Sequence, residues 1–340
     1  MGRLKELLAQ KQILVLHGPL GTELEAMGYD VSGKLWSAKY LLEKPEVIQE
    51  LHEIYLNNGS NILTTSTYQA TIPGLEAAGL NPEQAADIIR LTVQLAHQAR
   101  DNYWQNLSDE QKTQTIYPLI SGDVGPYAAY LADGSEYNGQ YGKVSLQELK
   151  DFHRPRIQLF LEQEVDMLAL ETIPNRLEVQ ALTELLSEEF PQIEGYMSFT
   201  AQETGKISDG TSLKDVIALV EACPQILAVG FNCTQPQLYD DLLQETRILS
   251  SKPLVTYPNS GETYDGATQT WHHNHEGEGS LVEQSLNWIH LGAQIVGAVV
   301  VQDLQRLPHS PKQFANKMSK LVGFFQSDII DVILYKKAIQ

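Results

Sequence analysis

The stretch MLALETI, residues 167–173, is an apolar run with no polar side chain before Glu171. Seven other runs rich in Val, Ile and Leu resemble it, and each is followed by a segment with helical periodicity. They are ILVLHG (13–18), NILTTST (61–67), YPLISGDVG (117–125), GYMSFT (195–200), LAVGFNCT (227–234), PLVTYPNSG (253–261) and AQIVGAVVV (293–301). Because continuous apolar strands are buried on both faces, these runs predict a parallel sheet covered by helices.

Eight strand–helix units within 340 residues predict an α/β fold of the (β/α)8 TIM barrel type, a single domain spanning residues 1–320. The remaining residues, 321–340, form a C-terminal tail that we predict to be helical. A doubly wound sheet is the alternative, and it would place a glycine-rich phosphate turn after the first strand. The segment HGPLGTELE (17–25) matches neither nucleotide-binding motif, so we expect no nucleotide cofactor.

The overall charge and composition exclude several classes of partner. The formal net charge is −19, from 43 acidic and 24 basic residues, which argues against nucleic-acid or anionic-membrane binding. The two cysteines, Cys223 and Cys233, are too few for a disulfide scaffold. The N-terminal segment MGRLKELLAQKQ lacks an apolar signal core, and no apolar run reaches the length of a membrane span. We therefore expect a cytoplasmic protein with small-molecule partners; its oligomeric state is not predicted.

Polar side chains cluster at the ends of the predicted strands, where the active face of such a barrel lies. No lysine stands there, which excludes a Schiff-base aldolase. Glu171 and Glu262 could serve as the two carboxyl groups of a glycoside hydrolase, or could orient loops and bind polar substrate groups. The polar residues at the strand ends are His17, Thr64, Thr65, Ser66, Thr67, Asp123, Glu171, Ser198, Thr200, Asn232, Cys233, Asn259, Ser260 and Glu262.

Two loops carry further candidates. The long loop after the third strand, GDVGPYAAYLADGSEYNGQYG (122–142), contains four tyrosines, among them Tyr127 and Tyr130. Their aromatic faces would suit a cationic ligand such as a sulfonium, whereas the alternative is that they pack the loop onto the barrel rim. The segment WHHNHEG (271–277) gathers His272, His273 and His275, which are possible metal ligands.

Several stretches along the chain form a combination typical of one family. They are GTELE (21–25), LWSAKYL (35–41), TSTYQAT (65–71), GPYAAYLADGSEYNGQYG (125–142), FHRPR (152–156), LETIPN (170–175), FNCT (231–234), YPNSGETYD (257–265) and TWHH (270–273). Together they resemble the homocysteine S-methyltransferase family of the bacterial type. The resemblance implies a TIM barrel that transfers a methyl group from S-methylmethionine or S-adenosylmethionine to homocysteine, giving methionine.

The resemblance also implies a zinc ion held by three cysteines, which takes the homocysteine sulfur as its fourth ligand and deprotonates it. One cysteine belongs to an N-C-T motif and corresponds to Cys233. The other two are adjacent in a G-G-C-C-R motif at the end of the eighth strand, where this chain has Val299 and Val300. Zinc is therefore expected for the family but doubtful here, because one of three metal ligands remains.

A second departure lies on the first strand. The resemblance assigns an Asp there, together with the glutamate of the fourth strand, to the amino group of homocysteine. This chain has His17 at the first position and Glu171 at the second. A histidine cannot neutralise an ammonium group. The candidate substrate-binding residues are His17, Glu171, Asn232, Ser260, Glu262, Tyr127 and Tyr130.

These features leave four hypotheses, with a homocysteine S-methyltransferase-like enzyme in first place. The first is a methyltransferase that works without zinc. The second is a replacement zinc site that uses Cys233 with His272, His273 or His275. The third is an inactive barrel that binds a ligand or a partner protein. The fourth is a methyltransferase with a changed acceptor.

Overall fold

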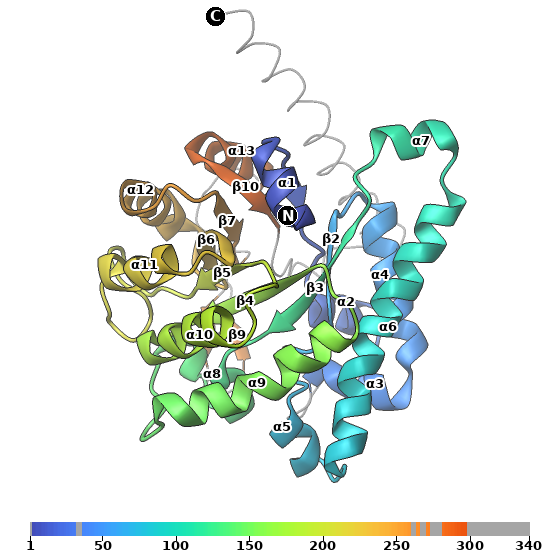
Figure 1. Cartoon of the computed structure of the whole chain (residues 1–340), viewed down its shortest axis with the longest axis horizontal. Helices are drawn as coiled ribbons and strands as arrows, with labels where there is room; N and C mark the ends of the chain where they lie inside the picture. Colours follow the sequence, from blue (N-terminus) through green and yellow to red (C-terminus); the bar gives the residue numbers. More distant parts are fainter. Residues whose placement is uncertain (1, 32–35, 260–262, 266–269, 273–280, 298–340) are drawn as a thin grey trace, which may run out of the picture.

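The computed structural model describes residues 2–31, 36–259, 263–265, 270–272 and 281–297. Its main sheet has eight strands, all paired in parallel, in the order β1-β10-β7-β6-β5-β4-β3-β2 (Figure 1). A bridge between Leu16 and Ile62 joins the two ends of this order and closes the barrel, which confirms the predicted TIM fold. The strands are β1 (Leu14–Val15), β2 (Ile62–Thr64), β3 (Leu119–Val124), β4 (Met167–Ile173), β5 (Gly195–Phe199), β6 (Ile226–Asn232), β7 (Leu254–Tyr257) and β10 (Ala293–Val296).

Helices follow the strands and form the outer layer of the barrel (Figure 1). Several begin at a side chain that caps free backbone N–H groups: Asn81, Ser108 and Ser145 form capping boxes, and Asn175 and Ser212 form simple caps. The helices are α1 (Arg3–Ala9), α2 (Leu20–Ala26), α3 (Tyr40–Glu43), α4 (Pro45–Asn57), α5 (Ile72–Ala77), α6 (Pro82–Asn106), α7 (Asp109–Gln114), α8 (Tyr127–Leu131), α9 (Leu146–Glu162), α10 (Arg176–Glu188), α11 (Leu213–Ala222), α12 (Tyr239–Leu249) and α13 (Leu281–Leu291).

Short elements occupy the connections. In the part of the chain that the structure describes, three 3-10 helices cover Trp36–Lys39 (η1), Ser135–Tyr137 (η2) and Pro236–Leu238 (η3). An antiparallel hairpin of β8 (Thr263–Asp265) and β9 (Thr270–His272) lies between β7 and α13. Among the described residues, no helix is long and apolar enough to cross a membrane. The predicted domain boundary at residue 320 and the tail at 321–340 lie outside the described residues.

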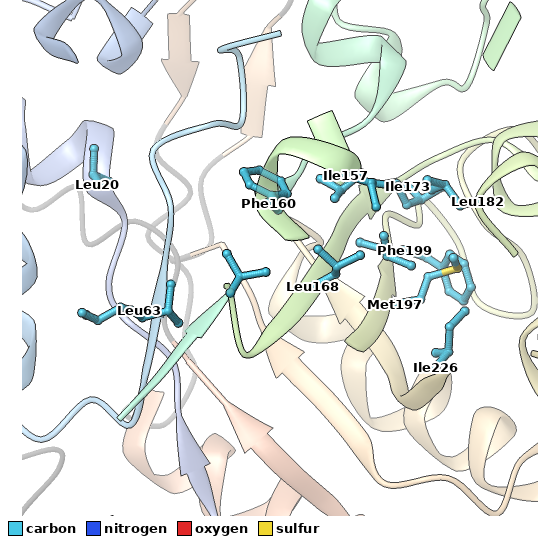
Figure 2. Packing of buried hydrophobic residues seen from close by; sticks show 14 of the residues in the cluster. Leu20, Leu63, Ile157, Phe160, Leu168, Ile173, Leu182, Met197, Phe199 and Ile226 are labelled. Carbon is cyan, nitrogen blue, oxygen red and sulfur yellow. The ribbon is translucent and has the colours of Figure 1, made fainter. Parts of the chain in front are cut away.

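The larger apolar core lies between the sheet and its helices. Figure 2 shows part of it, where Leu63, Leu168 and Met197 of the strands lie with helical residues such as Ile157, Phe160 and Leu182. All of these side chains are fully buried. Burial of apolar area at about 25 cal/mol per Å² makes this layer the main stabilising contribution to the fold.

A second apolar cluster fills the barrel interior. Strand residues in this cluster include Leu119, Met167 and Ala169, which alternate along the chain with residues of the outer core. Three leucines of α1 (Leu4, Leu7 and Leu8) belong to the same cluster. Helix α1 therefore closes the N-terminal end of the barrel, and the polar side chains gather at the opposite, C-terminal end.

Candidate active site at the barrel mouth

Glu171 stands at the centre of the polar end of the barrel. It follows Met167 and Ala169 on the inward-facing side of β4. Its Oε2 accepts hydrogen bonds from the hydroxyl of Tyr257 at 2.8 Å and from that of Tyr196 at 3.4 Å. Burial raises the pKa of the Glu171 carboxyl to about 7, while the two tyrosine hydroxyls act in the opposite direction. The group is therefore close to the balance point between its neutral and charged forms near neutral pH.

Asn232, at the end of β6, holds together the neighbouring strand ends. Its Oδ1 accepts hydrogen bonds from the Thr172 backbone N–H and from Ser198 Oγ, both at 2.8 Å. Its Nδ2 donates to Thr172 Oγ1 at 2.7 Å and to Cys233 Sγ at 3.3 Å. Thr172 and Cys233 both have left-handed backbone, with φ of 61° and 47°. Such conformations are unfavourable outside glycine and persist only where surrounding contacts enforce them, as this buried amide does.

Cys233 is a neutral thiol in this environment. Burial raises its pKa to about 12, and the nearby negative charge of Glu171 acts in the same direction. Metal coordination requires the thiolate form, so a metal bound here would displace the thiol proton.

The donors present do not fit the three-thiolate zinc set that the sequence resemblance implies. Within the described ranges, no group of three His, Cys, Asp or Glu side chains could hold a metal ion. Residues 299 and 300 are valines, which carry no donor atom, and lie outside the described residues, as do His273, His275, Ser260 and Glu262. For His272 the structure describes the backbone, in β9.

His17 points away from the barrel interior. Leu14 and Leu16 lie in the interior cluster, so the next residue faces the helices. Its ring packs edge-on against Tyr55 of α4 at 5.7 Å between centroids, and its Nδ1 has no hydrogen-bond partner. Burial lowers the pKa of His17 to about 4, so the ring is neutral at pH 7. These contacts do not bring His17 together with Glu171; its role in substrate binding stays a prediction.

Tyr127 and Tyr130 form part of an aromatic cluster at the barrel rim. Tyr127 lies 5.6 Å from Tyr130, 5.4 Å from Tyr141 and 5.0 Å from Phe152 of α9, measured between ring centroids. Tyr130 also contacts Phe152 at 5.5 Å. The arrangement matches the alternative in which the loop tyrosines pack the loop against the barrel. Their role as ligand-binding residues stays a prediction.

A buried polar network, not predicted from the sequence, anchors this loop. Glu178 is fully buried, and its Oε1 accepts hydrogen bonds from the Tyr127 backbone N–H at 2.6 Å and from His153 Nε2 at 2.8 Å. Its Oε2 accepts a short hydrogen bond from the Tyr141 hydroxyl. His153 contacts Arg156 through Nδ1, at 3.2 Å. His153 and Arg156 belong to the FHRPR stretch (152–156), but nothing in that stretch predicts that His153 contacts a glutamate on α10.

Arg156 continues the network to the strand ends. Its guanidinium donates to the carbonyl oxygens of Thr67 at 3.1 Å and Gly125 at 2.7 Å. It thereby ties α9 to the segments that leave β2 and β3. Asp123, at the end of β3, is almost fully buried, and its Oδ1 has no hydrogen-bond partner.

A closed (β/α)8 barrel with a carboxyl group at the end of β4 and an amide and a thiol at the end of β6 defines a TIM-barrel protein with an enzyme-like site. A model of the homocysteine S-methyltransferase family matches residues 14–298. The chain belongs to this family, and the resemblance noted from its sequence is confirmed.

Individual relatives cover most of the chain. It is similar to a homocysteine S-methyltransferase of Escherichia coli strain K12, with 43% identity over 294 residues, 86% of this chain and 93% of that protein. It is also similar to a selenocysteine Se-methyltransferase of Brassica oleracea var. italica, with 41% identity over 86% of this chain and 87% of that protein. A crystal structure of an Escherichia coli homocysteine methyltransferase in a metallated form superposes with a TM-score of 0.79 at 37% identity, covering 94% of this chain and 99% of that chain.

Proposed function

We propose that this protein transfers a methyl group from a sulfonium donor, S-methylmethionine or S-adenosylmethionine, to the sulfur of homocysteine. The observation that carries the proposal is the inward-facing Glu171 beside the Asn232–Cys233 pair, in a chain that belongs to the homocysteine S-methyltransferase family. The partly buried carboxyl of Glu171 supplies a counter-charge for the ammonium group of an amino acid. The apolar barrel interior below it keeps water from the reacting atoms.

The reaction is a displacement at carbon. The thiol proton of homocysteine passes to water, and a lone pair of the sulfur forms a bond to the donor methyl carbon. The bond between that carbon and the sulfonium sulfur breaks, and its electron pair neutralises the departing sulfur. No atom is oxidised or reduced. The protein's own task is to hold the two sulfur atoms and the methyl carbon in line, where effective molarities are worth about 7–11 kcal/mol.

A zinc ion held by three thiolates would supply the deprotonation and the position of the acceptor sulfur. One thiol and two valines do not provide that set. With an ordinary thiol pKa of about 8.5, only a few per cent of homocysteine is thiolate at pH 7, a penalty of about 2 kcal/mol. We therefore propose slow transfer to homocysteine by the present sequence.

A changed acceptor is the second candidate, and one observation favours it. A selenocysteine Se-methyltransferase is among the relatives of this chain, at 41% identity. A selenol is more acidic than a thiol, so at neutral pH it is ionised without help from a metal. The absence of the two other metal-binding thiols would therefore reduce the rate of transfer to selenocysteine less than the rate of transfer to homocysteine.

The test is an assay of the purified chain with S-methylmethionine as donor and either homocysteine or selenocysteine as acceptor. Because the donor itself becomes methionine, the first function is supported by two methionines formed for each homocysteine consumed, a reaction abolished in a Glu171→Gln variant. Methylation of selenocysteine at a much higher rate supports the second. No methylated product with either acceptor or with S-adenosylmethionine contradicts both and leaves a ligand-binding barrel.

A further inference from the structure

Asp123 places a second carboxyl group on the inner face of the barrel. Asp123 lies four residues after Leu119 on β3, so the two side chains point to the same face of the strand, and Leu119 lies in the interior cluster. On the adjacent β4, Glu171 follows Met167 and Ala169 with the same parity, and Asp123 pairs in register with Ala169. Asp123 and Glu171 are therefore diagonal neighbours on one face of adjacent strands.

Among the described residues, none forms an ion pair with the Asp123 carboxyl. Arg156 attracts it electrostatically, but the guanidinium donates its hydrogen bonds to the carbonyl oxygens of Thr67 and Gly125. The Oδ1 atom of Asp123 is buried without a hydrogen-bond partner. A buried carboxyl oxygen without a partner is costly, which favours a bound group that supplies one.

The charged and titratable groups that act on Asp123 come from three elements: Glu171 on β4, Tyr196 on β5 and Arg156 on α9. Burial raises the pKa of Asp123 well above its ordinary value; Glu171 adds to this shift and Arg156 opposes it. Like charges on neighbouring carboxyl groups oppose each other's ionisation, so each carboxyl of this pair favours its protonated form more than an exposed carboxyl does. A cation bound between them would favour ionisation of both.

Resting on the proposed function, we propose that Asp123 is a specificity-determining residue that, together with Glu171, binds the ammonium group of the amino-acid substrate. It takes over the role of the first-strand carboxylate that the family resemblance implies and that His17 does not provide. Entry of the ammonium group lets both carboxyl groups ionise, so binding releases a proton.

The experiment is calorimetric titration near pH 7 with L-methionine, a stable probe that carries the ammonium group, in two buffers of different ionisation enthalpy. The deaminated analogue 4-(methylthio)butanoate serves as the matched ligand. For the unaltered protein we expect proton release with L-methionine, and binding at least tenfold stronger than that of the analogue. An Asp123→Asn variant should lose most of both effects. Asp123→Ser provides a second variant if the first does not fold, and Asp87→Asn on the surface of α6 is the control.

Thermal denaturation distinguishes this role from a structural one. Removing an unpartnered buried carboxyl should leave the melting temperature unchanged or higher, whereas loss of a structural ion pair would lower it. The proposal is overturned if Asp123→Asn binds L-methionine with the original affinity and proton release, or if its loss of binding follows a loss of stability. Failure of the proposed function would appear differently, as an absence of methyl transfer by the unaltered protein.

A second inference concerns the valines themselves, and it rests on a different observation. The family match ends at residue 298, directly before Val299. The codons for Ala298, Val299, Val300 and Val301 have the forms GCN, GTN, GTN and GTN. Here N stands for any base. A reading frame that starts at the third base of the Gly297 codon joins that base to the first two bases of the next codon, and so on, which gives the triplets NGC, NGT, NGT and NGT. These forms admit GGC-TGT-TGT-CGT, which encodes Gly-Cys-Cys-Arg.

In this alternative frame the two cysteines fall at the positions of Val299 and Val300, in the register that the family motif requires. We infer that residues from 298 onward are read one base out of frame relative to the preceding chain, and that the neighbouring frame encodes the missing cysteines. This explains why two adjacent metal ligands are lost together and why the family resemblance stops at that point.

The nucleotide sequence decides the matter. The inference requires GGG for Gly297, GCT for Ala298, GTT for Val299 and GTC for Val300; any other third base at one of these four codons overturns it. If the codons agree, a gene restored to the neighbouring frame should yield a protein that purifies with zinc. A restored chain with the Cys-Cys pair but without zinc would contradict the assignment of these positions as ligands.

Discussion

Replacing Glu178 with alanine should destabilise the protein by about 3–5 kcal/mol, the loss expected when one member of a buried charged network is removed. The substitution leaves the Tyr127 N–H, the Tyr141 hydroxyl and His153 Nε2 buried without their acceptor. Each unsatisfied group alone costs about 1–3 kcal/mol, and relaxation around the shortened side chain keeps the total below the sum. The buried guanidinium of Arg156, which contacts His153, also loses a nearby negative charge.

Urea denaturation and thermal melting measure this loss. With an unfolding entropy of about 2.1 cal/mol/K per residue over 340 residues, 3–5 kcal/mol corresponds to a melting temperature lower by about 4–7 °C. Glu188→Ala on the same helix is the matched control, because Glu188 pairs with Lys150 but its side chain is 61% exposed. The control should change stability by no more than about 0.5 kcal/mol. Equal losses in the two variants would refute the network as the anchor of the loop.

Acid should destabilise the fold through His52 and His17. Burial lowers the pKa of His52 to about 3 and that of His17 to about 4, from an ordinary value of 6.5. Below pH 6.5 these two histidines therefore bind protons in the unfolded chain but stay neutral in the folded chain. The free energy of unfolding is therefore highest above pH 6.5 and falls as the pH drops toward 4, by about 3 kcal/mol for His17 alone. A His52→Phe variant should lose less of this free energy between pH 7 and pH 5, measured by urea denaturation. Gly230→Ala would place a Cβ 1.9 Å from the Val255 carbonyl oxygen, so we expect a loss of at least about 3 kcal/mol or insoluble protein, measured by melting and by yield. Asn232→Leu should lower stability by about 2–4 kcal/mol by removing the amide that joins three strand ends; an unchanged melting temperature would contradict that role.

The fold was predictable because its strands are apolar on both faces. MLALETI, read as one strand over residues 167–173, coincides with β4. The sequence predicts a strand over residues 13–18, but β1 contains only Leu14 and Val15 and is extended by the single bridge at Leu16. Apolar composition thus indicates which segments enter the barrel, whereas strand length depends on hydrogen bonds to neighbours that are remote in sequence.

The site was less predictable, because its groups depend on orientation and on distant partners. A strand-end position does not show whether His17 faces the interior or the helices, and the structure turns it toward α4. Glu178 lies in the first turn of α10 and looks like any polar residue of a helix, since Tyr127, Tyr141 and His153 are far from it in sequence. Asp123 was recognised as a strand-end carboxyl, but the absence of a partner for its Oδ1 is visible only in three dimensions.

The zinc content of the purified chain tests the central claim most directly, namely that Cys233 is the only family metal ligand left in this sequence. The protein is expressed with added zinc, freed of loosely bound metal and measured by mass spectrometry, beside a Val299→Cys, Val300→Cys variant. We predict zinc far below one ion per chain in the unaltered protein and close to one ion per chain in the variant. A full equivalent of zinc in the unaltered protein would contradict the account and would direct the search for further ligands to His272, His273 and His275.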